Sequence, residues 1–182
     1  SYVYSYSAME KGITKLAQQY PSLVKIRSVG VTFDGRQIYD FIIGNTDADR
    51  ELILATGMTA EDTEKTRLFL DDAENFLMNY RTGKTGDRSY EELFENACVH
   101  IIPMRNPDGI SIAQFGLDGI RNTSQKHRIR SIALINIKNS GKDMSLSEYF
   151  STWKANARGI DLEYNAGKGS GTAKTFPGAE GY

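Results

Sequence analysis

The chain has 182 residues, of which 40% are hydrophobic and 10% aromatic, and its formal net charge is −1. This composition predicts one globular domain over residues 1–182, and the balanced charge excludes nucleic acid and anionic membranes as evident partners. No apolar run approaches the ~18 residues of a membrane-spanning helix, and the single cysteine, Cys98, excludes an intrachain disulfide.

The first elements follow from periodicity and turn residues. Residues 6–20 carry apolar side chains at helical spacing, and Pro21 ends this helix. Residues 24–31 and 37–44 read as strands, and Asp34-Gly35 between them is a hairpin turn.

Two short apolar runs, residues 52–56 and 97–103, are typical of central strands that are buried on both faces. Between them, residues 61–80 form a predicted helix with an apolar stripe at Leu68, Phe69, Ala73, Phe76 and Leu77. The pattern predicts an α/β fold, a three-layer α/β/α arrangement around a mixed sheet.

The remaining segments read mostly as loops. Residues 81–88 are predicted as a loop, residues 90–94 as a helical turn, and Asn-Pro-Asp-Gly at residues 106–109 as a tight turn. Residues 116–145 lack a clear period and are expected at the surface. The tail at residues 167–182, rich in Gly, Ser, Thr and Lys, is expected to be a mobile loop.

Several segments carry a family resemblance when they are taken in order. They are Tyr6-Ser7, residues 18–21, Gly30 with residues 34–38, the strand end Gly57-Met58 with Glu61, residues 103–109, residues 153–162 and residues 176–182. Together they resemble the first part of the zinc carboxypeptidases, the carboxypeptidase A-like metallopeptidases. The segment at residues 153–162 is most similar to the bacterial branch that cleaves γ-D-glutamyl-diamino acid bonds in peptidoglycan stem peptides.

The resemblance implies a zinc site that this chain lacks. The family places a His after the glycine and a Glu three residues later, whereas this chain has Met58 and Glu61. The second His and the general-base Glu of the family fall beyond the end of this chain. A catalytic zinc needs three protein ligands and an open position, and a thioether suits Cu(I) better than Zn²⁺. We therefore expect no zinc to be bound, with Glu61 a vestigial ligand position.

The resemblance also implies altered substrate positions. Ala60 stands where many members have an arginine, and Glu163 and Tyr164 occupy the positions of the family's carboxylate-binding Asn and Arg. Arg158 falls where a substrate-polarising arginine is expected.

Each of these residues also has a structural reading. Glu61 suits the N-terminus of a helix, Met58 fills space, and Arg158 could pair with Asp161 or Glu163. His100 reads as a hydrogen-bonded core or edge histidine and Cys98 as a small buried apolar residue. His127 lies among basic residues that are typical of a solvated face.

The resulting hypothesis is a zinc carboxypeptidase-like protein, related to hydrolases of peptides or peptidoglycan stem peptides but itself inactive. The alternative is a non-catalytic binding or structural domain, and in a third hypothesis a partner chain supplies the missing half. Expected ligands are peptides or cell-wall stem peptides, and a homodimer is expected through the surface that the second half would cover, near residues 167–182. The first residue, Ser1, suggests processing, compatible with secretion or the cell envelope.

Overall fold

The computed structural model describes residues 3–163 of the chain. Its strands are β1 (Val24–Val31), β2 (Gln37–Gly44), β3 (Glu51–Ala55), β4 (Lys84–Thr85), β5 (Arg88–Ser89) and β6 (Cys98–Ile102). Its helices are α1 (Tyr6–Gln19), η1 (Ala60–Asp62), α2 (Thr63–Met78), α3 (Tyr90–Phe94), α4 (Pro107–Phe115), η2 (Gly116–Gly119), α5 (Thr123–Ser140) and α6 (Leu146–Ser151). The predictions for Tyr164 and for the tail at residues 167–182 lie outside the described residues.

The main sheet has four strands in the order β1-β2-β6-β3. The β1–β2 and β2–β6 pairs are antiparallel, and the β6–β3 pair is parallel, so the sheet is mixed as predicted. The predicted hairpin turn is present between β1 and β2, where Gly35 has a φ of +76° that a residue with a Cβ rarely adopts.

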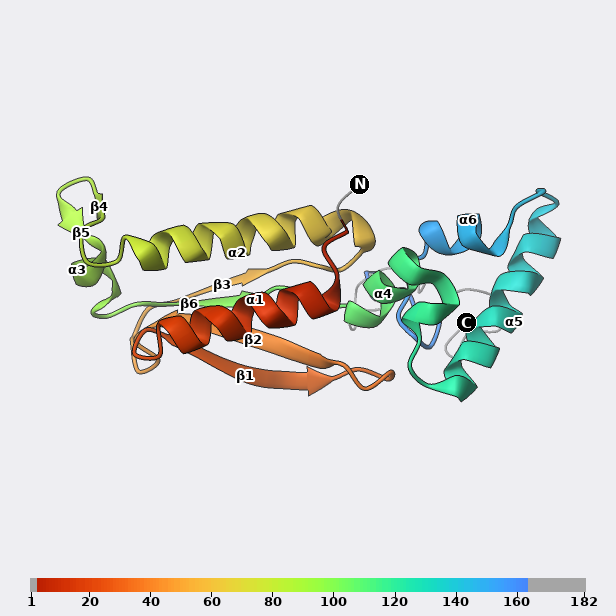
Figure 1. Ribbon diagram of the computed structural model, residues 1–182, viewed down its shortest axis with the longest axis horizontal. Coiled ribbons are helices and arrows are strands. Elements are labelled where there is room, and N and C mark those ends of the chain that lie inside the picture. The colour runs from red at the N-terminus through yellow and green to blue at the C-terminus, as the bar shows by residue number, and fades with distance from the viewer. Residues whose placement is uncertain (1–2, 164–182) are drawn as a thin grey trace.

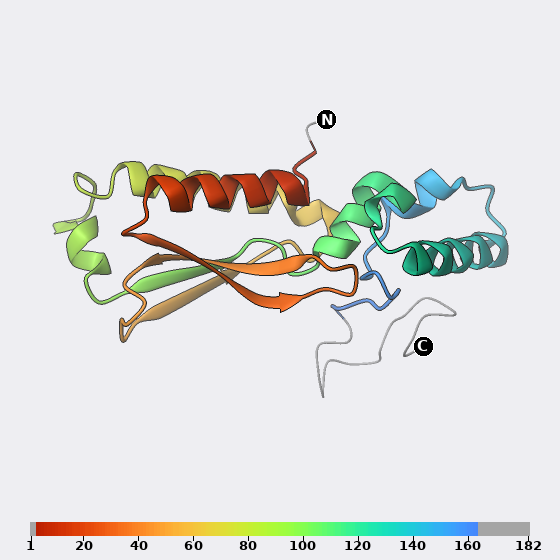
Figure 2. The same ribbon diagram turned by 60° about the horizontal axis from the view of Figure 1, so that its bottom comes forward.

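Helices α1 and α2 form a layer on one face of this sheet (Figures 1 and 2). Met9, Ile13 and Leu16 of α1 pack with Leu70 and other buried side chains of α2 on Phe41, Ile43 and Ile101 of the sheet. This packing confirms the predicted α/β class with a mixed sheet and places the larger apolar core between the helices and the strands.

The position of β3 differs from the prediction of a central strand buried on both faces. Of the strands described, β3 pairs only with β6, and it therefore forms an edge of the sheet. Leu52 and Ile53, whose side chains point to opposite faces of the sheet, are 53% and 63% exposed. The apolar run correctly predicted a strand, but burial on both faces requires a layer over each face, and helices α1 and α2 lie on one face of the sheet. Strand β6 pairs with β2 and β3 and is the inner strand of the two.

A second, helical cluster formed by α4, α5 and α6 packs beyond the end of the sheet (Figure 1). Its core includes Trp153. Residues 116–145, which lack a clear period in the sequence and are expected at the surface, contain the 18-residue helix α5. No apolar stripe is evident in this helix because Ile129, Ile132 and Ala133 are buried whereas Leu134 and Ile135 are 43% and 47% exposed.

Residues 106–109 also differ from the prediction of an isolated tight turn. Asn106 caps α4 by accepting a hydrogen bond from the Gly109 N–H (3.0 Å), and Pro107 occupies the first position of the helix. Proline is favoured there because its fixed φ suits the first helical turn. Gly109 has no positive φ and belongs to the helix.

None of the helices within residues 3–163 is long and apolar enough to cross a membrane.

Candidate functional site

A cavity of about 450 Å³ lies at the carboxyl end of β3. It is bordered by the start of η1, the end of β6 and the segment after α6. Its lining residues are Met58, Thr59, Glu61, Asp62, Arg105, Lys154, Leu162 and Glu163. The structure therefore brings together three of the predicted site positions, Met58, Glu61 and Glu163.

Gly57 places Met58 at the rim of this cavity. Its φ is +68°, and a Cβ on it would lie 2.5 Å from the Pro103 carbonyl oxygen and 2.6 Å from the Cα of Met104. Only glycine fits such a close approach of the two strand ends. The Asn106 N–H then donates to the Gly57 carbonyl oxygen (3.0 Å) and fixes the turn that presents Met58.

The buried amide of Asn106 joins two walls of the cavity. Its Nδ2 donates to the carbonyl oxygens of Met58 (3.2 Å), Lys154 (3.2 Å) and Ala155 (3.3 Å). Asn106 is 2% exposed, so these bonds are shielded from water. One side chain thus sets the spacing between the Met58 turn and the Lys154 segment.

Asp62 supports the same turn from the helix side. Its Oδ2 accepts hydrogen bonds from the N–H groups of Met58 (3.2 Å) and Thr59 (3.3 Å), and its Oδ1 accepts one from Lys65 Nζ (2.9 Å). Burial raises the pKa of Asp62, but these hydrogen bonds outweigh it and hold the pKa below its usual range. Asp62 is therefore engaged with the backbone as an ionised carboxylate.

The donors of this cavity do not fit the zinc that the family resemblance implies. Its lining combines the thioether of Met58 and three carboxylates with the cations of Arg105 and Lys154. Within residues 3–163, none of these carboxylates joins two further His, Cys, Asp or Glu donors in a group close enough to hold a metal. Catalytic zinc requires three converging ligands, so we derive no zinc chemistry at Met58 and Glu61.

Arg158 does not line this cavity. Its guanidinium carbon lies 4.1 Å above the centroid of the Phe33 ring, a cation–π contact, and the backbone N–H of Arg158 donates to Asn156 Oδ1 (2.8 Å). The cations in the lining are instead Arg105 and Lys154, neither of which is among the site residues predicted from the sequence. Arg105 directly precedes Asn106-Pro107, and Lys154 directly follows Trp153. These positions, inside segments that resemble the family, are the signal that could have identified them.

A second polar cluster lies on the sheet, away from this cavity. His100 Nδ1 is 2.9 Å from Asp40 Oδ2, which also accepts a hydrogen bond from Arg27 Nε (2.7 Å). His100 Nε2 is 3.3 Å from Cys98 Sγ. Burial, together with the charges of Glu51 and Asp40, raises the pKa of the Cys98 thiol. Cys98 is buried and His100 is a hydrogen-bonded core histidine, as their structural readings predicted.

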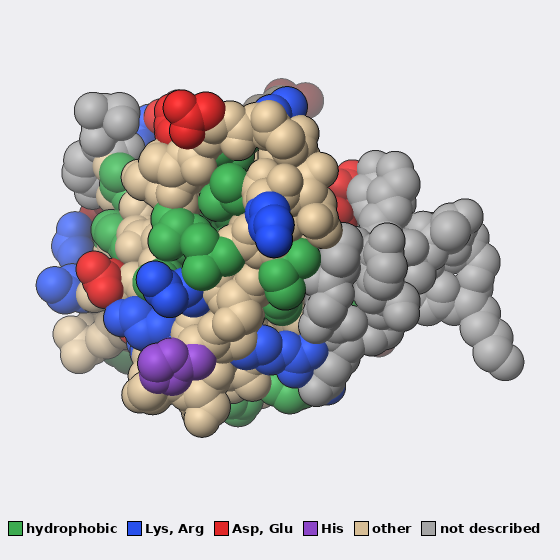
Figure 3. All heavy atoms as spheres, turned by 90° about the vertical axis from the view of Figure 1, so that its right-hand side faces the viewer, with side chains coloured by type: hydrophobic (Ala, Val, Ile, Leu, Met, Phe, Trp, Pro, Cys, Tyr) green, Lys and Arg blue, Asp and Glu red, His purple; other side chains and the backbone are tan. Residues whose placement is uncertain are grey.

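The end of the molecule formed by the helical cluster has a basic surface. Figure 3 shows Lys and Arg side chains there together with a histidine. Helix α5 contributes Lys126, Arg128 and Arg130 around the exposed His127. His127 therefore lies on a solvated basic face, as predicted.

Comparison with known proteins identifies the family to which the chain belongs. The family model described as zinc carboxypeptidase matches residues 9–176. The chain is 26% identical over 111 residues to mouse carboxypeptidase M, covering 58% of this chain and 24% of that protein. It is 27% identical over 161 residues to gamma-D-glutamyl-L-diamino acid endopeptidase 1 of Lysinibacillus sphaericus, covering 87% of this chain and 36% of that protein.

The solved structure of a metallo-carboxypeptidase from Burkholderia cenocepacia aligns with 96% of this chain and 35% of its own, at a TM-score of 0.52 and 15% identity. This similarity shows the fold. The chain spans well under half the length of each of these relatives. Because the family match extends over most of its residues, the chain belongs to the zinc carboxypeptidase family.

Proposed function

We propose that this chain is a peptide-binding domain of the zinc carboxypeptidase family that does not itself hydrolyse peptides. The observation that carries the proposal is the donor set of the cavity. The sequence resemblance aligns Met58 with the family's histidine position. Glu61 lines the cavity, and among residues 3–163 it has no two further metal-binding donors close to it. A thioether cannot replace an imidazole on Zn²⁺, so the water activation that the family chemistry requires is not supported.

The proposed ligand is a peptide with a free carboxylate. Arg105 and Lys154 approach the cavity from two walls, and Asn106 fixes those walls relative to each other. Arginine and lysine are the side chains that bind carboxylates by charge-assisted hydrogen bonds. The similarity to a gamma-D-glutamyl-L-diamino acid endopeptidase supports peptidoglycan stem peptides as members of this class.

The test is a binding titration of the chain with a stem-type peptide whose terminal carboxylate is free or amidated. We expect the free form to bind more tightly, and Arg105→Gln and Lys154→Gln each to weaken it. Arg67→Gln is the matched control, because Arg67 lies on α2 and pairs with Asp71 (2.7 Å) rather than facing the cavity. Equal binding of the two peptides, or equal loss in the control, would overturn the proposed ligand class.

A second candidate, a structural domain that assembles through β3, is favoured by the exposed edge of the sheet. An exposed edge strand presents unpaired backbone groups, and apolar side chains add a driving force for pairing. In an antiparallel pair of two β3 strands centred on Ile53, Leu52 of each copy would face Leu54 of the other. The segment is therefore self-complementary, and the proposed assembly is a two-fold homodimer.

A further inference from the structure

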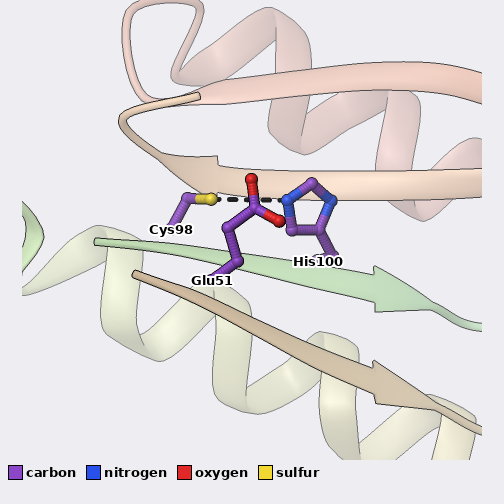
Figure 4. A group of neighbouring side chains, drawn as sticks. All are labelled: Glu51, Cys98 and His100. Atoms are coloured by element: carbon purple, nitrogen blue, oxygen red, sulfur yellow. Dashed lines mark hydrogen bonds between the residues drawn. The ribbon is translucent and has the colours of Figure 1, made fainter. Parts of the chain in front are cut away.

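Three side chains with different metal-binding atoms meet on the sheet at Glu51, Cys98 and His100. Glu51 and Cys98 are direct partners across the parallel β3–β6 pair. His100 lies two residues further along β6, and residues two apart in a strand share a face. Figure 4 shows the three side chains on the same side of these strands. The strand register, rather than any sequence motif, creates this group.

The distances within the group suit a small ion. Cys98 Sγ and His100 Nε2 are 3.3 Å apart, and the donor atoms of all three residues lie within 4.8 Å of one another. Zinc bonds of about 2.3 Å to sulfur and about 2.0 Å to nitrogen at a tetrahedral angle place those two atoms about 3.5 Å apart. The sulfur and nitrogen are thus already near coordinating separation, and the exposed Glu51 can complete the set by a change of rotamer.

Asp40 prepares the imidazole for this role. Its Oδ2 accepts a hydrogen bond from His100 Nδ1 at 2.9 Å, and Arg27 Nε holds the same oxygen at 2.7 Å. Asp40 is 2% exposed, so the carboxylate is fixed on His100. With the proton on Nδ1, the lone pair of Nε2 points toward Cys98. A carboxylate on the outer nitrogen is the usual support of a zinc-bound histidine.

We propose that Glu51, Cys98 and His100 bind a Zn²⁺ ion, with Asp40 as the positioning residue. The ion takes a carboxylate oxygen of Glu51, the Nε2 lone pair of His100 and the thiolate of Cys98. One proton leaves Cys98 Sγ for solvent, and no electron is transferred. The fourth position is open to water or to a donor from a partner. This site is distinct from the Met58–Glu61 position and does not rest on the proposed function. The sequence predicts that the chain binds no zinc, a prediction drawn from Met58 and Glu61, and an ion bound at Cys98 would correct it.

The donor types select the metal. A thiolate and an imidazole disfavour Mg²⁺ and Ca²⁺, which take oxygen ligands, whereas Zn²⁺ accepts all three donors. The contacts from Cys98 to His100 and from His100 to Asp40 would also suit a catalytic triad, with Cys98 as nucleophile, His100 as base and Asp40 as the acid that orients it. However, Cys98 is only 1% exposed, so a peptide carbonyl has little access to its sulfur. An ion entering beside the exposed Glu51 needs far less room.

The test uses the full chain, reduced and freed of metal, and titrated with Co²⁺ and then Zn²⁺. Because Cys98 is the only cysteine in the sequence, a thiolate-to-cobalt charge-transfer band assigns the ion to this residue. We expect one equivalent of Co²⁺ to give this band, with tetrahedral visible bands, and one equivalent of Zn²⁺ to displace it.

The variants Cys98→Ser, His100→Gln and Glu51→Gln should weaken binding strongly, and Cys98→Ser should also remove the charge-transfer band. Asp40→Asn should keep the band while weakening affinity about 10- to 100-fold. Glu95→Gln is the matched control, an exposed glutamate between α3 and β6, and should leave binding unchanged. Far-ultraviolet circular dichroism of each variant identifies any that fail to fold.

Cobalt binding without a thiolate band would overturn the proposal, as would failure of the folded chain to bind at micromolar concentration. A band that persists at full affinity in Glu51→Gln or His100→Gln would also contradict it. Rapid alkylation of Cys98 by a peptide-derived electrophile, with no metal bound, would identify the group as a nucleophilic triad instead.

Discussion

The Nη1 of Arg36 lies 2.9 Å from Oδ1 of Asp108, although the two residues are 72 positions apart in the chain. The same Nη1 bonds to Asp34 (2.6 Å), and the Nη2 donates to the Gly119 carbonyl oxygen (2.6 Å). The side chains of Arg36 and Asp108 are 6% and 1% exposed. One buried guanidinium therefore ties the β1–β2 hairpin turn to α4 and η2, and so connects the sheet to the helical cluster.

Replacing Arg36 with methionine should lower the free energy of unfolding by about 3–5 kcal/mol, because two buried carboxylates would lose their shared cation. Urea denaturation measures the change. The matched control is Arg67→Met, which removes an exposed ion pair with Asp71 (2.7 Å) and should cost less than about 0.5 kcal/mol. Equal effects of the two substitutions would show that the Arg36 network does not couple the two clusters.

Substitution by alanine should change the stability in opposite directions at two glycines, Gly12 and Gly109. A Cβ on Gly12, within α1, would meet no atom closer than 3.5 Å, so Gly12→Ala should stabilise the chain by about 0.5–1 kcal/mol. A Cβ on Gly109 would lie 2.3 Å from Asn106 Nδ2 and 2.4 Å from the Ala155 carbonyl oxygen. Gly109→Ala should therefore destabilise by about 1–3 kcal/mol. Thermal unfolding of both variants checks the signs, and stabilisation by Gly109→Ala would contradict the described packing around Asn106.

The lowered pKa of Asp62 predicts a pH-dependent contribution to stability. Asp62→Ala removes the acceptor for the Met58 and Thr59 N–H groups and should cost about 1 kcal/mol at pH 7. Because the folded pKa lies below the unfolded value of about 3.9, this contribution is fully present above that value. It should shrink as the pH falls through the folded pKa. Denaturation curves of both proteins between neutral and acidic pH test this, and a difference that grows on acidification would refute it.

The exposed edge strand β3 predicts concentration-dependent dimerisation. Size exclusion with light scattering should detect a homodimer in the micromolar range, and Ile53→Lys should abolish it, because Ile53 is 63% exposed at the centre of the strand. The matched control, Val29→Lys, changes a 49% exposed residue on the opposite edge strand, β1, and should leave the dimer intact. A monomer at all concentrations, or a dimer lost only in Val29→Lys, would contradict pairing through β3.

The sequence predicted the elements near the sheet well because their signals are local. Strand β2, the Asp34-Gly35 turn and helix α1 agree with the predicted bounds within a residue. Helix α2 was also predicted, but its buried face was assigned partly wrongly: Leu68 is 50% exposed, whereas Thr66 is fully buried. Thr66 Oγ1 donates to the Pro103 carbonyl oxygen (2.7 Å), so a polar side chain faces the core. Hydrophobicity alone cannot identify such a position.

The parts of the site that depend on tertiary packing could not be predicted. Met58 and Glu61 were found because they lie close together in the chain. Lys154 lines the cavity through tertiary packing, in which Asn106 bonds to its carbonyl oxygen across 48 positions. The group proposed to bind a metal, Glu51, Cys98 and His100, likewise depends on the register between β3 and β6, which fixes Glu51 opposite Cys98. The alternation of side chains along a strand places Cys98 and His100 on one face, but no feature of the nearby sequence identifies Glu51 as the third residue.

The cavity at Met58 is proposed to bind carboxylate-bearing peptides without hydrolysing them. The most direct measurement incubates the chain with a free-carboxylate stem-type peptide and excess Zn²⁺, and follows bound and cleaved peptide in the same sample by mass spectrometry and titration. We predict saturable binding with no product above the protein-free blank, for the natural chain and for Met58→His alike. Product that increases with protein concentration and is lost in Glu61→Gln would contradict the claim.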